Sequence, residues 1–481
     1  MYQKTLILTF LLLGSLLFYQ CQKKEDSPYP NIIFILADDM GYGDPGCYNP
    51  GSKIPTPNIN SIAREGMRFT NAHAPGTWCV PTRYGLLTGR YPVHVNTADI
   101  DHTALIEEDQ ITIAGLLKSH GYSTGMVGKW HLGFLNGDSL DYSKPLRGGP
   151  VDHGFDYFFG IPASLDIPPY YYIENDRCVQ PPTDSIGPSH TAGYYPIQGA
   201  FWREGKVAPD FIHSEVLPTL TDKAITFIQS QDPSSSSPFF LYLALTAPHT
   251  PWLPSESFQD SSGAGLYGDF TVQVDHSVGL VLKELDQLGL EDNTLVFFTS
   301  DNGPVWYERD SERFDHQSTH YLRGMKADAY EGGHRMPFLA KWPGHIRAGT
   351  HTRELICFTD MLATFSDLLD HSLPSLTYKE SASILPVLLG EKYPPQIKNE
   401  VIIEDWAVIQ HHWKFIKGNG SGWISNRYKK EDHIEKDVQG ELYHLEEDST
   451  ETRNLYFQYP EKVVRMKSVL DSYTHSQIPS Q

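Results

Sequence analysis

The nine residues 31–39, NIIFILADD, place two aspartates directly after an apolar run. Three further apolar runs also end in polar, chemically capable side chains: residues 123–127 precede Lys129 and His131, residues 239–246 precede His249, and residues 294–300 precede Asp301 and Asn302. Apolar runs of this length are typical of strands that are buried on both faces, as in parallel sheets. The sequence therefore predicts four buried strands with reactive groups at their ends.

Helical patterns separate these strands, at residues 58–65, 112–120, 214–229 and 271–288. Alternating strands and helices favour an α/β fold, a large and mostly parallel sheet with helices on both faces. Ligands of such sheets bind beyond the carboxyl ends of the strands. All four polar clusters are expected at that edge.

The C-terminal region has a different pattern. Residues 401–404, 412–417 and 441–445 predict short strands, and residues 460–473 predict a helix. We expect a small antiparallel sheet packed on the main domain. The predicted boundaries are a targeting segment at 1–20, a catalytic domain at 28–385 and a C-terminal α+β subdomain at 386–481.

The composition limits the partners. The 481 residues carry a formal net charge of -21, which argues against a nucleic-acid partner because phosphate backbones are bound by clustered Lys and Arg. An anionic substrate would need a local positive pocket against this overall field.

The N-terminus predicts export. Lys4 precedes a short apolar run at residues 6–17, too short for a stable membrane span. Cys21 and the polar residues after it resemble a bacterial lipoprotein cleavage site. We expect a periplasmic or cell-surface protein, anchored to the outer membrane through a lipid on Cys21; an ordinary secretory signal is the alternative.

Disulfides are not expected to be the main covalent support. Of five cysteines, Cys21 and Cys79 have other predicted uses. Cys47, Cys178 and Cys357 remain, so at most one intrachain bridge can form.

Residues 79–83, CVPTR, predict the beginning of a helix, because Pro81 is favoured in a first turn. Cys79 would lie at the helix N-terminus and Arg83, four residues later, on the same face. The free backbone N–H groups at such an end attract anions. Taken alone, Cys79 is equally compatible with a small buried apolar side chain.

The longer stretch 79–92, CVPTRYGLLTGRYP, resembles the signature of the formylglycine-dependent sulfatases of the alkaline phosphatase superfamily, in which this cysteine is oxidised to an aldehyde. Further segments match that family in order: residues 31–43 (NIIFILADDMGYG), 128–133 (GKWHLG), 301–303 (DNG) and 441–448 (ELYHLEED). The resemblance extends from about residue 31 to 455. It implies an alkaline-phosphatase-like fold and a bacterial polysaccharide sulfatase.

Oxygen ligands gather at two predicted strand ends, where Asp38 and Asp39 follow one strand and Asp301 and Asn302 follow another. Hard oxygen donors favour Ca²⁺ or Mg²⁺. An isolated Asp-Asp pair is more commonly a loop cap, but the second pair favours a metal. The resemblance implies one Ca²⁺, bound by these four residues and by the formylglycine made from Cys79.

A sulfate monoester is anionic, so its site needs cations. Arg83, Lys129 and Lys326 can supply them. Lys326 matches a sulfate-binding lysine of the family, although by itself it would be taken for a surface residue.

His131 and His249 each follow a predicted strand, where a hydrogen-bonded loop histidine is the more common role. The resemblance implies that both take part in the reaction. It also implies that Ser164, in residues 160–166 (GIPASLD), contacts the sulfate.

The resemblance further implies a mechanism. One hydroxyl of the hydrated aldehyde at residue 79 attacks sulfur, and the metal lowers the pKa of that hydroxyl. Asp301 would accept its proton, and His249, aided by Lys326, would protonate the leaving alcohol. His131 would deprotonate the second hydroxyl so that sulfate leaves. A formylglycine-generating maturation enzyme is an implied partner.

Residues 156–202 are rich in aromatic side chains that could stack on sugar rings or pack the segment onto the main domain. These are Tyr170, Tyr171, Tyr172, Tyr194, Tyr195 and Trp202. His411, His412 and Trp413 could form another sugar subsite. With export, these features favour a sulfated polysaccharide or its oligosaccharides, of the algal-glycan or glycosaminoglycan type, over a small aryl sulfate.

Two other functions compete. A phosphoester hydrolase of the same superfamily would normally need two metals with more His and Asp ligands. An inactive glycan-binding lipoprotein would keep the fold and lose the chemistry of Cys79. Assays on matched sulfate and phosphate esters separate these possibilities.

Overall fold

The computed structural model describes residues 29–97, 103–135, 140–232, 237–374, 379–391, 400–427 and 438–474. Its central strand is β1 (Asn31–Asp38), in which every residue is buried. β1 lies between β10 (Thr294–Ser300) and β9 (Phe239–Pro248), parallel to both. β3 (Ser123–Lys129) follows β9 in the sheet, also in parallel. The four predicted strands are therefore neighbours, which brings their carboxyl ends together.

The complete sheet has eleven strands, in the order β12-β2-β11-β10-β1-β9-β3-β4-β5-β6, with β13 paired to β2. Its other strands are β2 (Met67–His73), β4 (Tyr157–Ile161), β5 (Ile173–Glu174), β6 (Arg177–Cys178), β11 (Arg335–Lys341), β12 (Thr350–Thr352) and β13 (Ile356–Cys357). β11 runs antiparallel between β10 and β2, so the sheet is mixed but mostly parallel around the centre.

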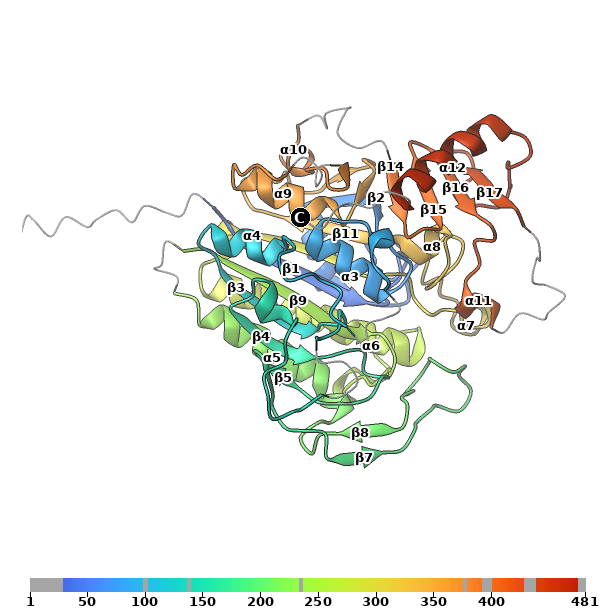
Figure 1. Cartoon of the computed structure of the whole chain (residues 1–481). Coiled ribbons are helices and arrows are strands. Elements are labelled where there is room, and N and C mark those ends of the chain that lie inside the picture. Colours follow the sequence, from blue (N-terminus) through green and yellow to red (C-terminus); the bar gives the residue numbers. More distant parts are fainter. Residues whose placement is uncertain are drawn as a thin grey trace, which may run out of the picture.

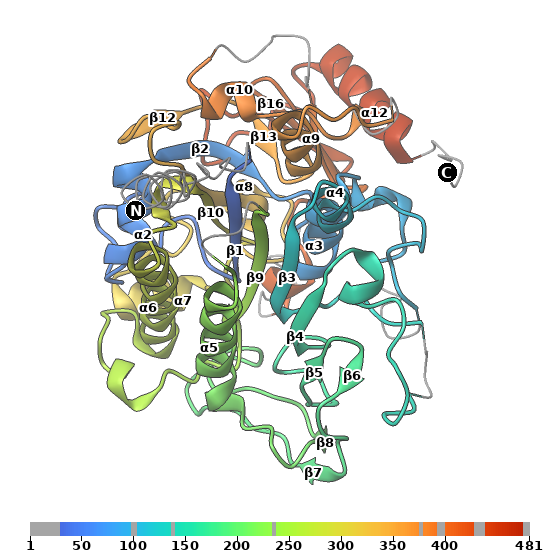
Figure 2. The same ribbon diagram turned by 90° about the vertical axis from the view of Figure 1, so that its left-hand side faces the viewer.

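Helices cover both faces of this sheet, as predicted (Figure 1). On one face lie α2 (Pro57–Glu65), α5 (Val216–Gln229) and α6 (Gly265–Gln287). On the other lie α3 (Cys79–Thr88), α4 (Ile113–Ser119) and α9 (Asp360–Leu368); Figure 2 shows both groups along the strands. The shorter helices are α7 (Glu308–Phe314), α8 (Glu331–His334), α10 (Leu385–Leu388) and α11 (Trp423–Asn426).

The C-terminal region forms the expected small antiparallel sheet, with the strand order β14-β15-β16-β17. Its strands are β14 (Glu400–Ile403), β15 (Ala407–Gln410), β16 (Trp413–Lys417) and β17 (Gly440–His444), and α12 (Pro460–Thr474) packs on β15 and β16. In Figure 1 this subdomain lies beside the β2 end of the large sheet. The α/β fold class is therefore confirmed.

Several elements were not predicted from the pattern. β2, with the sequence MRFTNAH, alternates buried and half-buried residues and lacks a long apolar run. The short β15 was also missed. α6 begins at Gly265, six residues before the predicted start, although Gly265 and Gly268 are poor helix formers. The carboxylate of Asp269 accepts hydrogen bonds from the backbone N–H groups of Asp260 and Ser262, and these contacts stabilise the first turns.

The predicted aromatic segment divides into two groups. Tyr170, Tyr171 and Tyr172 are buried, so they pack the segment onto the main domain. Tyr194, Tyr195 and Trp202 are half-buried. A two-stranded sheet of β7 (Asp184–Ile186) and β8 (Gly205–Val207) extends this segment outward.

The targeting segment at 1–20 and Cys21 lie outside the described residues. Within the described ranges, no helix combines the length and the apolarity needed to cross a membrane. The four cysteines in those ranges, Cys47, Cys79, Cys178 and Cys357, are free thiols.

A buried ionic cluster joins the subdomain to the main domain. Lys414 of β16 lies 3.0 Å from Glu331 Oε1, 2.8 Å from Glu451 Oε1 and 2.9 Å from His334 Nε2. His73 of β2 contacts His334 through their Nδ1 atoms, 3.1 Å apart. The His73, Glu331 and His334 ligand atoms resemble a metal site, but the Lys414 ammonium already provides the cation.

We expect Lys414→Met to lower the free energy of unfolding by about 3–5 kcal/mol, because it leaves Glu451 buried without its cation and leaves Glu331 with Arg335 alone. Lys417→Met is the matched control, since Lys417 ends the same strand and is exposed. Chemical denaturation of both variants measures the difference. Equal stability of the two variants would show that the cluster does not hold the subdomain.

Candidate active site

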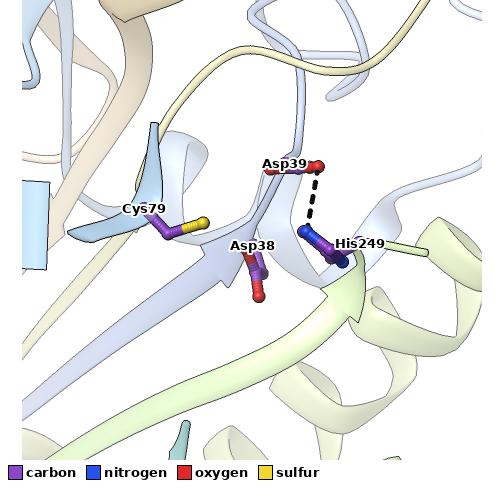
Figure 3. A group of neighbouring side chains, drawn as sticks. All are labelled: Asp38, Asp39, Cys79 and His249. Carbon is purple, nitrogen blue, oxygen red and sulfur yellow. Dashed lines mark ion pairs between the residues drawn. The ribbon is translucent and has the colours of Figure 1, made fainter. Parts of the chain in front are cut away.

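A group of four side chains lies where β1 and β9 end and α3 begins (Figure 3). Asp38 ends β1, Asp39 follows it with a positive φ of 65°, and His249 follows β9. Cys79 begins α3 on the opposite side. The ligand atoms of Asp38, Asp39, Cys79 and His249 all lie within 4.8 Å of one another, and all four residues are buried.

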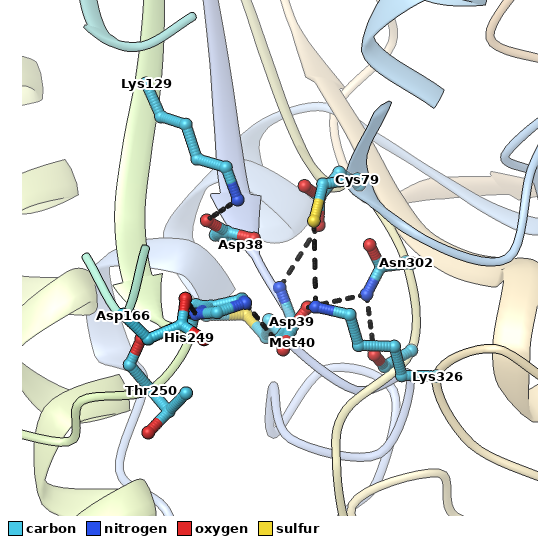
Figure 4. A network of polar contacts seen from close by, with 12 residues as sticks. Asp38, Asp39, Met40, Cys79, Lys129, Asp166, His249, Thr250, Asn302 and Lys326 are labelled. Atoms are coloured by element: carbon cyan, nitrogen blue, oxygen red, sulfur yellow. Dashed lines mark hydrogen bonds and ion pairs between the residues drawn. The ribbon is translucent and has the colours of Figure 1, made fainter. Parts of the chain in front are cut away.

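Three cations contact three carboxylates in this centre (Figure 4 shows the two lysines). The closest contacts are Lys129 Nζ to Asp38 Oδ2 at 2.7 Å, Lys326 Nζ to Asp39 Oδ1 at 2.6 Å and Arg83 Nη2 to Asp301 Oδ2 at 2.8 Å. Arg83 also donates to the backbone carbonyl of Lys129, so its guanidinium is held inside the protein. The formal charges of these six groups cancel.

Two buried oxygen atoms in the centre have no hydrogen-bond partner among the described residues. They are Asp38 Oδ1 and Asn302 Oδ1. The Asn302 amide nitrogen donates to Asp39 Oδ1 at 2.7 Å, and Asp301 Oδ1 accepts from the backbone N–H of Asp39 at 3.1 Å. Unpaired buried oxygens are costly, and a hard divalent cation would satisfy them. The four predicted ligands therefore fit a Ca²⁺ or Mg²⁺ ion.

The pKa values of Asp38 and Asp301 are shifted in opposite directions by burial and by the neighbouring charges. Burial favours the neutral form of Asp38, but Lys129, His249 and Arg83 outweigh it and hold the pKa of Asp38 well below its usual range. Burial and the charge of Asp38 raise the pKa of Asp301 to about 7. A cation bound between these carboxylates would oppose that rise.

Cys79 lies at the helix N-terminus, as predicted, and all ten residues of α3 are buried. Its Sγ is 3.6 Å from Lys326 Nζ. Burial raises the pKa of the thiol, although Lys129 and Lys326 act in the opposite direction. An unmodified thiol here would thus be a poor nucleophile at neutral pH.

His249 is fixed by its neighbours. Its Nδ1 lies 2.6 Å from the carbonyl of Thr250, which can only accept, so Nδ1 carries a proton. Its Nε2 lies 3.7 Å from Asp39 Oδ2. A further proton on Nε2 would make the ring cationic, and Asp39 would stabilise that charge.

His131 has a different environment. It adopts a positive φ of 55° directly after β3, and its Nδ1 is buried without a partner among the described residues. Burial, with Lys129 and Arg83 nearby, holds the pKa of His131 well below its usual range. The ring is therefore neutral and able to accept a proton.

Ser164 is buried in the loop after β4, and its Oγ has no hydrogen-bond partner in the described structure. Two residues later, Asp166 reaches the centre: its Oδ1 is 4.0 Å from His249 Nδ1, and its Oδ2 accepts from Arg203 at 2.5 Å. Sequence reasoning missed Asp166 as a site residue. The one sequence feature that could have indicated Asp166 is its position two residues after Ser164, within residues 160–166.

Comparison with known proteins identifies the family. Residues 30–371 match the Sulfatase family model, and residues 325–475 match the model described as N-sulphoglucosamine sulphohydrolase, C-terminal. The chain belongs to the sulfatase family. It is therefore a sulfuric ester hydrolase, and the family implies a formylglycine and a metal at the centre described above.

Several relatives resemble this sulfatase along most of its length. The N-acetylgalactosamine-6-O-sulfatase of Bacteroides thetaiotaomicron is 33% identical over 505 residues, which cover 96% of this chain and 98% of that protein. Human arylsulfatase A is 36% identical over 375 residues, 76% of this chain and 69% of that protein. A solved structure from work on glycosaminoglycan metabolism by B. thetaiotaomicron has a TM-score of 0.80 and 32% identity, covering 94% of this chain and 100% of that one.

The C-terminal subdomain of the sulfatase also supports the segment before Cys79, which the sequence did not suggest. Glu404 Oε1 accepts from the backbone N–H of Thr77 at 2.8 Å and from its hydroxyl at 2.9 Å. Glu404 Oε2 accepts from the indole of Trp78 at 3.2 Å. The backbone N–H of Ala327, next to Lys326, donates to the Thr77 carbonyl at 2.8 Å. Glu404 therefore positions both sides of the centre.

We expect Ca²⁺ to raise the melting temperature of the chelator-treated sulfatase, because an ion that binds only the folded state stabilises it, by about 2.7 kcal/mol at 100 times Kd. Asn302→Ala should lose most of this increase, measured by differential scanning calorimetry with and without Ca²⁺. Asn293→Ala, at an exposed asparagine, is the control. An undiminished Ca²⁺ response in Asn302→Ala would exclude the amide as a ligand.

Proposed function

We propose that this sulfatase removes sulfate from a sulfated polysaccharide or its oligosaccharides, using a formylglycine made from Cys79 and one Ca²⁺. Two observations support the carbohydrate substrate. One relative, whose match to this chain covers 98% of the relative's own length, is an N-acetylgalactosamine-6-O-sulfatase. The aromatic segment also leaves Tyr194, Tyr195 and Trp202 partly exposed. N-acetylgalactosamine 6-sulfate is therefore the first sugar ester to test.

The balance of charge in the centre carries the proposal. Three buried carboxylates and three buried cations cancel, and Asp38 Oδ1 and Asn302 Oδ1 have no hydrogen-bond partner in the part of the chain that the structure describes. Asp38, Asp39, Asp301 and Asn302, together with the modified residue 79, would hold the ion. When bound, it would supply Lewis-acid charge that lowers the pKa of the nucleophile and neutralises sulfate oxygens. With the ion bound, the centre would carry a net positive charge, which suits an anionic ester.

The side chains around the centre divide the remaining work. Lys326 lies beside Cys79, where it can hold the ester oxygens at the position of attack. Lys129 helps to keep Asp38 ionised, and Arg83 fixes the carboxylate of Asp301 in position. His249, as an imidazolium stabilised by Asp39, donates its Nε2 proton to the leaving alcohol.

Neutral His131 accepts a proton from residue 79 when sulfate is released, through Nδ1, which has no hydrogen-bond partner among the described residues. Asp301 accepts the proton of the hydroxyl of residue 79 that attacks sulfur. Ser164, whose buried hydroxyl has no hydrogen-bond partner among the described residues, donates to a sulfate oxygen. These roles use groups that are already buried and oriented, so little reorganisation is needed during the reaction.

We also propose that the protein is exported. Residues 1–20 act as the signal, Cys21 carries a lipid, and the enzyme works in the periplasm or at the cell surface. The catalytic domain covers residues 28–385 and the subdomain residues 386–481. A formylglycine-generating enzyme prepares Cys79.

We expect Cys79→Ser to stop turnover or to trap a covalent sulfate ester, because serine offers one hydroxyl and cannot release sulfate as an aldehyde hydrate can. Sulfate release and intact-protein mass spectrometry measure both outcomes. Mass spectrometry of the tryptic peptide spanning residue 79 tests the modification in the native enzyme. Full activity with an unmodified thiol, or normal turnover by Cys79→Ser, contradicts the aldehyde role.

The substrate class is tested by sulfate release from size-defined oligosaccharides that carry single sulfate positions, alongside an aryl sulfate and matched phosphate esters. We expect kcat/KM to be highest for a sugar 6-sulfate. Phosphate esters should be turned over far more slowly, because the site fits one metal. Activity confined to aryl esters would refute the carbohydrate substrate.

A further inference from the structure

A cavity of about 460 Å³ lies between the β12 edge of the large sheet and the C-terminal subdomain. Its walls come from distant parts of the chain. Tyr42 and Tyr48 follow β1, Arg68 belongs to β2, Arg353 follows β12, and His411 lies in the turn between β15 and β16. None of the predicted catalytic or metal-binding residues lines it. The cavity is therefore separate from the active site.

The charge of this cavity opposes that of the whole protein. Its lining includes three arginines and four histidines but a single carboxylate, that of Glu446, in a chain with a net charge of -21. Arg335 is paired with Glu331 at 3.2 Å. Arg68 and Arg353 form no ion pair with any carboxylate in the described ranges. Arg68 donates from Nη1 to the carbonyl of Cys47, so its other N–H groups and the guanidinium of Arg353 remain for an anion.

Aromatic rings accompany these cations. The rings of Tyr42 and Tyr48 lie 4.7 Å apart, and Arg68 lies over the Tyr48 ring at 5.5 Å from its centroid. Tyr321, at the rim, is 41% exposed. A lining of ring faces, fork-shaped cationic donors and imidazoles suits a sugar ring that bears a negative group. Arginine alone would suit any small anion, but the exposed ring surface favours a sugar.

The cavity is built on the same loops as the active site. Tyr42 follows Asp39 by three residues, so their Cα atoms are at most about 11 Å apart. Tyr321 precedes Lys326 by five residues. A polymeric substrate with one sugar in the active site therefore has further units within reach of this region.

We propose that this cavity binds a second anionic sugar unit of the sulfated glycan, apart from the unit that loses its sulfate. This inference rests on the proposed carbohydrate substrate. It also gives His411 and His412 a place, because both predicted subsite residues line the cavity. Trp413 does not line it, since its ring packs on His444 and Tyr459.

The test uses Arg353→Ala/His411→Ala, which removes two exposed side chains from the rim. Arg347→Ala is the control, because Arg347 is exposed near β12 and lies outside the cavity. The first measurement is calorimetric binding of an oligosaccharide containing uronic acid and N-acetylgalactosamine 6-sulfate to the Cys79→Ala protein. Adding the double substitution should weaken Kd about tenfold, as expected for two contacts of exposed side chains worth up to about 1 kcal/mol each, whereas Arg347→Ala should not.

The second measurement compares kinetics in the active enzyme. The double variant should raise KM for the oligosaccharide and leave kcat/KM for an aryl sulfate unchanged. Equal oligosaccharide KM and Kd in the double variant and the Arg347→Ala control would overturn the inference, even if glycans are hydrolysed. Inorganic sulfate that competes as well as the oligosaccharide would also overturn it. Glycan binding without glycan hydrolysis would instead refute the proposed substrate alone.

Discussion

The structure depends on the neutralisation of three carboxylates that are buried at the ends of two adjacent strands. Asp38, Asp39 and Asp301 lie where β1 and β10 end side by side, in a region that excludes water. Isolated charges in such a place would be prohibitively costly. Arg83, Lys129 and Lys326 arrive from three other segments to compensate them. Because the buried carboxylates need nearby cations, the folded chain brings together the same cationic side chains that a sulfate ester needs.

The sequence predicted the centre of the fold well and its edges poorly. The four central strands are almost entirely buried, and β1, β9 and β10 are accordingly rich in apolar residues, whereas β3 (STGMVGK) has small and polar residues among its apolar ones. In β2, half-buried polar residues obscure the pattern, whereas β15 is mostly buried but has only four residues, too few for a clear period. The early start of α6 depends on Asp269, whose partners Asp260 and Ser262 lie in the loop just before the helix, outside the periodic pattern from which the helix was predicted.

The same contrast holds for the active site. Residues at strand ends, such as Asp38, Lys129, His249 and Asp301, could be selected because their position follows from the strand. Asp166 and Glu404 could not, because each contributes through a partner distant in sequence: Arg203 for Asp166, and Thr77 for Glu404. Nothing in the local sequence distinguishes a buried glutamate that accepts three hydrogen bonds from one on the surface.

Glu404 and Thr77 are 327 residues apart in sequence, so their contact can form only long after Thr77 has been synthesised. At about 5–20 residues per second, the ribosome needs roughly 16 to 65 s to add Glu404 after Thr77 has been made. Throughout that interval the segment before Cys79 lacks its final clamp, whereas in the finished fold every residue of α3 is enclosed. For the oxidation of Cys79 proposed above, the order of synthesis therefore leaves the segment of this thiol without the Glu404 contact until the C-terminal subdomain has been made.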